Sequence, residues 1–145
     1  MSDDREQRPT VALAKKIDHV TVVVKDMEAA VTTFRNNFSF PVGLTGASPE
    51  LNMRFTCLHI GDALLEILQP TNEKNAGMQF LSDRGEGMYA LSLEVESLDD
   101  AVAQLAKMGI STRVQSFREG SRLCFISPEH THGVVLQLIE HTRPR

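Results

Sequence analysis

The sequence predicts an α+β fold in which two βαβββ modules form one curled, eight-stranded mixed sheet, a cup with helices on its outer face. The first observation is an internal duplication, because residues 18–31 and 89–102 follow one pattern at an offset of 71 (90 − 19). The offset returns near the end of each copy, where Glu66 is matched by Gln137. The second observation is that alternating apolar runs, typical of strands, follow a helix in both copies.

In the first copy, valines at every second position after His19 predict a strand with one apolar face. Asp26 is a helix cap, and the apolar spacing that follows predicts a helix to about Phe38. An extended segment starts at Pro41, and residues 46–52, which contain a proline, are expected to form a loop. Two alternating runs joined by the turn Gly61-Asp62 predict strands, at Met53–Ile60 and Ala63–Gln69.

The second copy repeats this order after a linker and a short helix, which we expect around 77–83. A strand is expected at 88–95, and Ser97 is the cap of a helix that ends near Met108, with a glycine following it. The remaining strands are expected at 110–115, 122–126 and 134–140. We expect the modules to span residues 16–70 and 86–140 of one domain, 16–145, after a flexible tail at 1–15.

Strand alternation indicates which side chains share a face of the sheet. Apolar residues at 20, 22, 24, 91, 93 and 95 are expected under the helices, so their neighbours face the concave side. Glu66 and Gln137 likewise face away from the leucines and isoleucine that flank them. The concave face, a default ligand site in a small domain, is expected to carry His19, Thr21, Glu66, Ala90, Ser92 and Gln137, all of them polar except the alanine.

The composition fits an ordinary globular domain of 145 residues with 41% hydrophobic and 23% charged residues. A formal net charge of −4 argues against nucleic acid and anionic membranes as partners. No apolar run reaches the roughly 20 residues that a membrane span needs. Cys57 and Cys124 lie in apolar, strand-like runs, so we expect buried, reduced thiols in a cytoplasmic protein.

The duplicated arrangement of one strand, one helix and three strands resembles the vicinal oxygen chelate superfamily, which includes glyoxalase I, extradiol dioxygenases and bleomycin-resistance proteins. The resemblance covers residues 16–140 and is closest to methylmalonyl-CoA epimerase. The matching segments are Ile17-Asp18-His19-Val20, Pro49-Glu50, Gly61-Asp62, Leu65-Glu66-Ile67-Leu68-Gln69-Pro70, Arg84-Gly85-Glu86-Gly87 and Gly133-Val134-Val135-Leu136-Gln137-Leu138. The resemblance implies a single glyoxalase-like domain and, by analogy with superfamily members of this size, a homodimer.

The resemblance also implies one metal ligand on each of four strands, and here the chain departs from the family. His19 and Glu66 match the first two ligands, whereas Ala90 and Gln137 replace a histidine and a glutamate. A methyl group coordinates nothing, and a neutral amide is a poor ligand for such cations. His19, Glu66 and Gln137 therefore form an incomplete set, from which we expect only weak binding of cobalt, nickel, zinc or manganese.

Two functions remain open at this point. The first is an isomerase or lyase that acts beside a carbonyl of a small acyl thioester, with Glu66 or Glu50 as base and His19 as acid or hydrogen-bond donor. Thr21, Ala90, Ser92 and Gln137 would contact the substrate. The second is a non-catalytic protein that binds or sequesters a small molecule, as in the bleomycin-resistance branch. A pair formed by His19 and Glu66 could also be purely structural.

Overall fold

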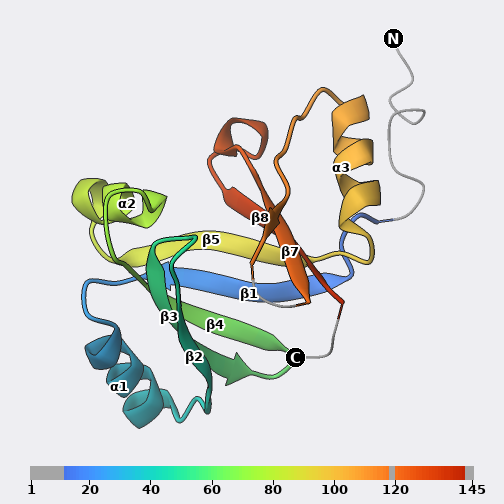
Figure 1. The fold of residues 1–145 in the computed structure, drawn as a ribbon. Coiled ribbons are helices and arrows are strands. Elements are labelled where there is room, and N and C mark those ends of the chain that lie inside the picture. Colours follow the sequence, from blue (N-terminus) through green and yellow to red (C-terminus); the bar gives the residue numbers. More distant parts are fainter. Residues whose placement is uncertain (1–11, 118–119, 143–145) are drawn as a thin grey trace. The chain divides into compact units, whose positions relative to one another are not determined.

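A computed structural model of the chain describes residues 12–117 and 120–142, with eight strands and three α-helices (Figure 1). The described residues divide into two compact units, one formed by Asp18–Leu91 and the other by residues 12–17, 92–117 and 120–142. The elements of the first module are β1 (Lys16–Val23), α1 (Met27–Phe38), β2 (Val42–Ser48), β3 (Met53–Ile60), β4 (Ala63–Pro70) and α2 (Ala76–Arg84). Those of the second are β5 (Gly87–Glu94), α3 (Leu98–Lys107), β6 (Gln115–Ser116), β7 (Ser121–Ile126), the 3₁₀ helix Pro128–His130 and β8 (Val135–His141).

The strands of the first module run in the order β2-β3-β4-β1. The pairs β2–β3 and β3–β4 are antiparallel, whereas β1 and β4 are parallel, so the module contains both pairing types. A hairpin joins β3 to β4, and Gly61 in its turn has φ +56°, a left-handed conformation that glycine adopts without strain. The register places Thr21 of β1 and Cys57 of β3 on either side of Glu66, and cross-strand partners share a face.

Helix α1 covers one face of these strands. Asp26 caps it by accepting a hydrogen bond from the Ala29 N–H at 3.0 Å, and Ser39 ends it in a left-handed conformation. The helix buries Met27 against residues of three strands, and a cluster forms from Val24, Met27, Leu58 and Ile67 with Val22, Ala30, Val31, Phe34, Phe40 and Leu65 at its margin. The predicted bounds of this helix and of β3 are confirmed to the residue.

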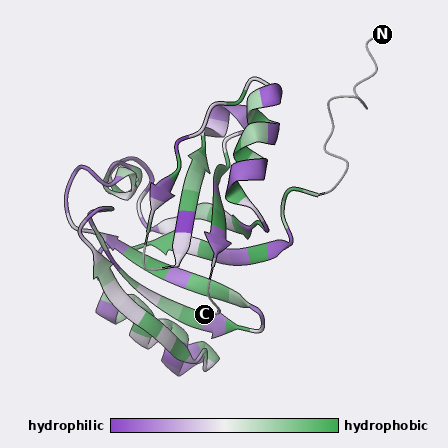
Figure 2. Ribbon diagram, turned by 45° about the vertical axis from the view of Figure 1, so that its right-hand side comes forward, coloured by the Kyte–Doolittle hydropathy of each residue, from purple (hydrophilic) through white to green (hydrophobic). Residues whose placement is uncertain are grey.

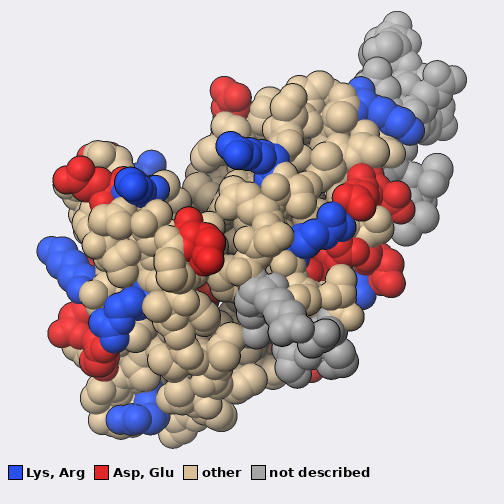
Figure 3. All heavy atoms as spheres, in the orientation of Figure 1, with Lys and Arg blue, Asp and Glu red and all other residues tan. Residues whose placement is uncertain are grey.

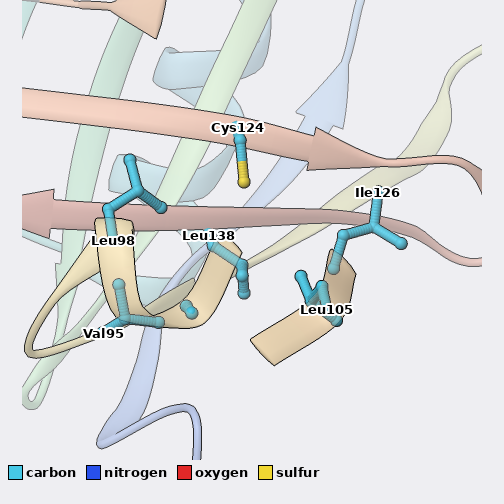
Figure 4. Packing of buried hydrophobic residues seen from close by; sticks show 7 residues of the cluster. Val95, Leu98, Leu105, Cys124, Ile126 and Leu138 are labelled. Atoms are coloured by element: carbon cyan, nitrogen blue, oxygen red, sulfur yellow. The ribbon is translucent and has the colours of Figure 1, made fainter. Parts of the chain in front are cut away.

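In the second module the strand order is β5-β8-β7-β6. Ser97 caps α3 through the Asp100 N–H at 3.1 Å, and Gly109 follows the helix with φ +80°. Figure 4 shows side chains of α3 and of neighbouring strands pointing toward one another, with the Cys124 sulfur among them. This core consists of Val95, Leu98, Ala101, Leu105, Cys124, Ile126 and Leu138. Leu13 also packs against it, and the Lys15 N–H donates to the Glu94 carbonyl.

Two boundaries differ from the prediction by more than one residue. The strand expected at 110–115 is only the short strand β6, Gln115–Ser116, because just these two residues pair with β7. Residues 46–48 continue strand β2 rather than starting the loop, and the turn occupies 49–52. The glycine and serine of this segment are typical of loops, but tertiary pairing with β3 overrides that preference. A Cβ on Gly46 would lie 3.3 Å from the Phe55 ring, so the missing side chain leaves room for that ring.

The predicted fold class is confirmed: the chain is α+β, with eight strands of mixed direction and three α-helices in the described residues. Figure 2 shows apolar and polar residues alternating around the helices, as expected where one side of each is buried. On the face seen in Figure 3, acidic and basic side chains are interspersed rather than separated by sign. Cys57 and Cys124 are buried and are not joined in a disulfide, in line with the expected reduced thiols. No helix in the described ranges is long and apolar enough to cross a membrane.

Candidate functional site

His19 and Glu66 lie on adjacent parallel strands of the first module and face the same side. Nε2 of His19 is 3.9 Å from Oε1 of Glu66, and the two residues are only 7% and 6% exposed. The opposite face carries Leu65 and Ile67, which pack in the α1 cluster. Strand alternation therefore directs Glu66 away from the helix, and the prediction that these two polar residues share a face is confirmed.

Thr21 holds the Glu66 carboxyl group in place. The Thr21 hydroxyl donates to Oε1 of Glu66 at 3.0 Å, and the backbone register makes the two residues direct cross-strand partners. The bond involves only one carboxyl oxygen, so Oε2 remains available for a second contact. A buried carboxylate needs such donors because it has lost its hydration.

Asp18 is a residue whose role sequence reasoning missed. Its Oδ2 lies 2.7 Å from Nδ1 of His19, and Asp18 itself is 2% exposed. A carboxylate only accepts hydrogen bonds, so this contact places a proton on Nδ1 and leaves Nε2, the atom nearer Glu66, to exchange protons or bind a ligand. The adjacent acidic residue was visible in the sequence, but adjacency on a strand normally separates two side chains onto opposite faces.

The second module contains an equivalent pair. The Ser92 hydroxyl donates to Oε1 of Gln137 at 2.6 Å, and both residues are buried. Leu136 and Leu138, on either side of Gln137, pack toward α3, so the amide faces away from that helix, as predicted. Ser92 and Gln137 are separated by 45 residues, the separation between Thr21 and Glu66. The duplication has therefore preserved a hydroxyl donor and its acceptor.

The remaining predicted site residues are Glu50 and Ala90. Glu50 is exposed in the turn after β2, where Ser48 donates to its Oε2 at 3.3 Å. Cys57, the cross-strand partner of Glu66, is four residues from Met53 at the start of β3, which is roughly 13 Å along a strand. The structure thus brings His19, Thr21 and Glu66 together, and the role of Glu50 stays a prediction. Ala90 lies on β5, half-buried. The convergence of positions 19, 66, 90 and 137 stays a prediction.

The donor set fits a divalent metal only in part. His19, with Asp18 behind Nδ1, has the support that metal-binding histidines usually have, and Glu66 supplies an anionic oxygen nearby. The set lacks the third strong ligand that catalytic metal sites require. Ala90 offers no donor atom, and the amide oxygen of Gln137 already accepts from Ser92. These residues do not fit the four-ligand site that the resemblance implies.

Comparison with protein families supports the fold. The family described as "Glyoxalase-like domain" matches residues 17–144, which is nearly the whole chain. This chain belongs to the glyoxalase-like domain family. The human mitochondrial methylmalonyl-CoA epimerase is 26% identical over 127 residues, covering 85% of this chain and 72% of that protein. An ethylmalonyl-CoA/methylmalonyl-CoA epimerase of Cereibacter sphaeroides is 24% identical over 128 residues, covering 85% and 96%.

Solved structures of glyoxalase-like epimerases superpose well on the chain. A variant of the Streptomyces coelicolor methylmalonyl-CoA epimerase in complex with 2-nitronate-propionyl-CoA has a TM-score of 0.84 and 27% identity, covering 90% of this chain and 99% of that one. The Mycobacterium tuberculosis methylmalonyl-CoA epimerase has a TM-score of 0.86 at 23% identity and covers 94% of each chain. The resemblance identified from the sequence is therefore confirmed.

Proposed function

We propose that this glyoxalase-like protein is an epimerase-like isomerase or lyase with a degraded metal site, acting beside the carbonyl of a small acyl thioester. The observation that carries the proposal is the 3.9 Å separation between Nε2 of His19 and Oε1 of Glu66, both buried on one face of two paired strands. The similarity to proteins named methylmalonyl-CoA epimerase supports an acyl-CoA as the substrate. A buried acid–base pair beside an acyl group suits proton transfer at carbon.

In this proposal Glu66 is the base. Its Oε2 removes a proton from the carbon next to the thioester carbonyl, and the electron pair of that C–H bond moves toward the carbonyl oxygen to form an enolate. In this step His19 is the imidazolium, with Nδ1–H donating to Asp18, and its Nε2–H donates a hydrogen bond to the developing oxyanion, which lowers the barrier by electrostatic stabilisation. Glu66 then returns a proton to the same carbon, either the one it removed or one exchanged with solvent while the carboxyl group holds it, and the carboxylate is regenerated. Thr21 and Asp18 act through their partners, because each fixes one of the two reacting groups.

A second candidate function is binding of a small molecule without turnover. It is favoured by the neutral Ser92–Gln137 pair, because an amide has no useful basicity and cannot replace the second base of a two-base epimerisation. The exposed position of Glu50, hydrogen-bonded to Ser48, points the same way. The protein would then hold its ligand as proteins of the bleomycin-resistance branch do.

Proton exchange separates the two functions. Chelator-treated protein is incubated with methylmalonyl-CoA in deuterated water, and incorporation of deuterium at the α-carbon is followed by mass spectrometry. We expect exchange by the wild type and a loss of about 100-fold or more in Glu66→Gln, since general base catalysis typically contributes 10²–10⁴-fold. The exposed Glu73 provides the matched control, Glu73→Gln, which retains exchange. Tight binding of the thioester without exchange would instead favour the binding protein, and equal exchange by both variants would remove Glu66 as base.

A further inference from the structure

The side-chain amide of Gln137 is almost fully buried, and only its oxygen has a hydrogen-bond partner in the described residues. The residue is 8% exposed, and its Oε1 accepts the hydroxyl hydrogen of Ser92, which is fully buried. Within the part of the chain that the structure describes, Nε2 has no hydrogen-bond acceptor, and it is not among the side-chain atoms enclosed without a partner. The Nε2 nitrogen is therefore accessible from outside the protein, and its two N–H groups are available to donate to solvent or to a ligand.

Ser92 determines which end of the amide is available. Because the Ser92 hydroxyl donates to Oε1, that oxygen has a partner and the amide group is held in one orientation, which leaves the Nε2 hydrogens as the available donors. The equivalent group in the first module has the opposite character. There Thr21 donates to Glu66, whose second oxygen can only accept a hydrogen bond or a proton. The two modules therefore offer complementary chemistry at duplicated positions, an acceptor in the first and a donor in the second.

The residue beside Gln137 on the neighbouring strand is aromatic, which suits an apolar part of a ligand. Phe125 of β7 is its direct cross-strand partner, so the two side chains lie on one face of the sheet. Phe125 remains 37% exposed, although large apolar residues on the other face of this module are buried in the α3 core. An exposed ring beside a buried amide donor matches a ligand with a short hydrocarbon chain next to an oxygen acceptor.

We infer that Gln137 is a specificity-determining residue whose side-chain amide N–H binds the carbonyl or carboxylate oxygen of a small acyl ligand, with Ser92 as the positioning residue. The inference deepens the proposed function and rests on it for the choice of an acyl compound. It does not require turnover, because a hydrogen bond to the acyl oxygen serves an enzyme and a binding protein alike. It gives Gln137 a role that a glutamate at this position could not perform, since a carboxylate has no N–H to donate.

The first test compares two ligands that differ in one oxygen. Binding of propionyl-CoA and of S-propyl-CoA, the thioether without the carbonyl oxygen, is measured by calorimetry. We expect the wild type to prefer the thioester by about 10-fold or more, since leaving a buried donor unpaired costs 1–3 kcal/mol. Gln137→Met, which keeps the length of the side chain, removes the preference, whereas the exposed Gln79→Met on α2 leaves it unchanged. An undiminished preference in Gln137→Met overturns the inference.

The second test needs no variant to fold, because it observes the wild type. The side-chain amide resonances of Gln137 are followed by ¹⁵N-edited NMR while propionyl-CoA, and separately sodium propionate, is added. A downfield shift of one Gln137 amide proton with either probe supports the inference, and a response to propionate alone would reject the thioester of the proposed function while keeping the donor role. An unchanged Gln137 amide with both probes, or an NH₂ group already bonded to Ser92, overturns it.

Discussion

Ser92 donates to Oε1 of Gln137 across 2.6 Å, at the two positions that correspond by duplication to Thr21 and Glu66 in the first module. The donor has kept its hydroxyl in both copies, whereas the acceptor is a carboxyl group in one and an amide in the other. Selection for a plain structural bond would not require the acceptors to differ in charge. The difference between the copies therefore points to separate roles toward a ligand, one acidic and one neutral.

Removing the hydroxyl group of each pair should lower the free energy of unfolding, and by a larger amount in the first module. We expect Thr21→Val to lower the free energy of unfolding by about 1.5–3 kcal/mol, because a buried carboxylate loses a hydrogen-bond donor. Ser92→Ala should cost less, about 0.5–1.5 kcal/mol, because its acceptor is neutral. Urea unfolding measures both, with the exposed Thr32→Val as control. A larger loss in Ser92→Ala than in Thr21→Val would contradict the assignment of charge to the first pair.

The helix caps provide a second duplicated pair, since Asp26 and Ser97 are also 71 positions apart. Each side chain accepts a backbone N–H in the first turn of its helix. We predict that Asp26→Ala and Ser97→Ala each lower the free energy of unfolding by about 0.5–2 kcal/mol. Glycine at either position should cost only a few tenths, because it keeps the cap conformation open to water. Thermal or urea unfolding tests this, and an alanine variant as stable as the wild type would contradict it.

Local signals explain why most of the fold was predictable from the sequence. The bounds of α1 and β3 follow from a cap at Asp26, alternation from Met53 and a turn at Gly61, all readable within a few residues. The end of β2 was not readable, because Gly46 is extended only through its pairing beside Phe55. Asp18 was missed for a related reason. Its contact with His19 depends on side-chain rotamers, which strand alternation does not predict.

Metal binding is predicted to be weak. Two of the four ligands that the resemblance implies are replaced, and one loss removes a negative charge, so affinity should fall far more than the roughly 10–100-fold caused by losing a supporting residue behind a ligand. Protein purified without added metal and then dialysed should carry little cobalt, nickel, zinc or manganese by mass spectrometry. His19→Ala should leave that low content unchanged. A stoichiometric ion in the wild type that disappears in His19→Ala would show that a competent site exists.

Burial in the α3 core raises the pKa of the Cys124 thiol. The folded state therefore holds this proton more tightly than the unfolded chain, in which a cysteine has a pKa of about 8.5. The resulting contribution is fully present below pH 8.5 and is lost as the pH rises toward the folded pKa. We expect the urea midpoint of the wild type to fall from pH 8 to pH 10 by more than that of Cys124→Ala. Parallel pH profiles would contradict this, since Cys57 is present in both proteins.

The chain is predicted to form a homodimer, and strand β2 is the edge we expect to contribute to it. β2 is the outermost strand of its module, with Val42 and Leu44 each 44% exposed, and Phe38 at the end of α1 is also exposed. Seven residues of unpaired strand edge with apolar side chains favour association with a second copy. Sedimentation should show about twice the 16.1 kDa of one chain at micromolar concentration.

Leu44→Lys should shift the protein toward the monomer, because a charge on an edge strand opposes pairing, whereas Met88→Lys, at an exposed position of β5, should not. A wild type that sediments only as a monomer would refute the dimer, and a dimer insensitive to Leu44→Lys would place its interface away from β2.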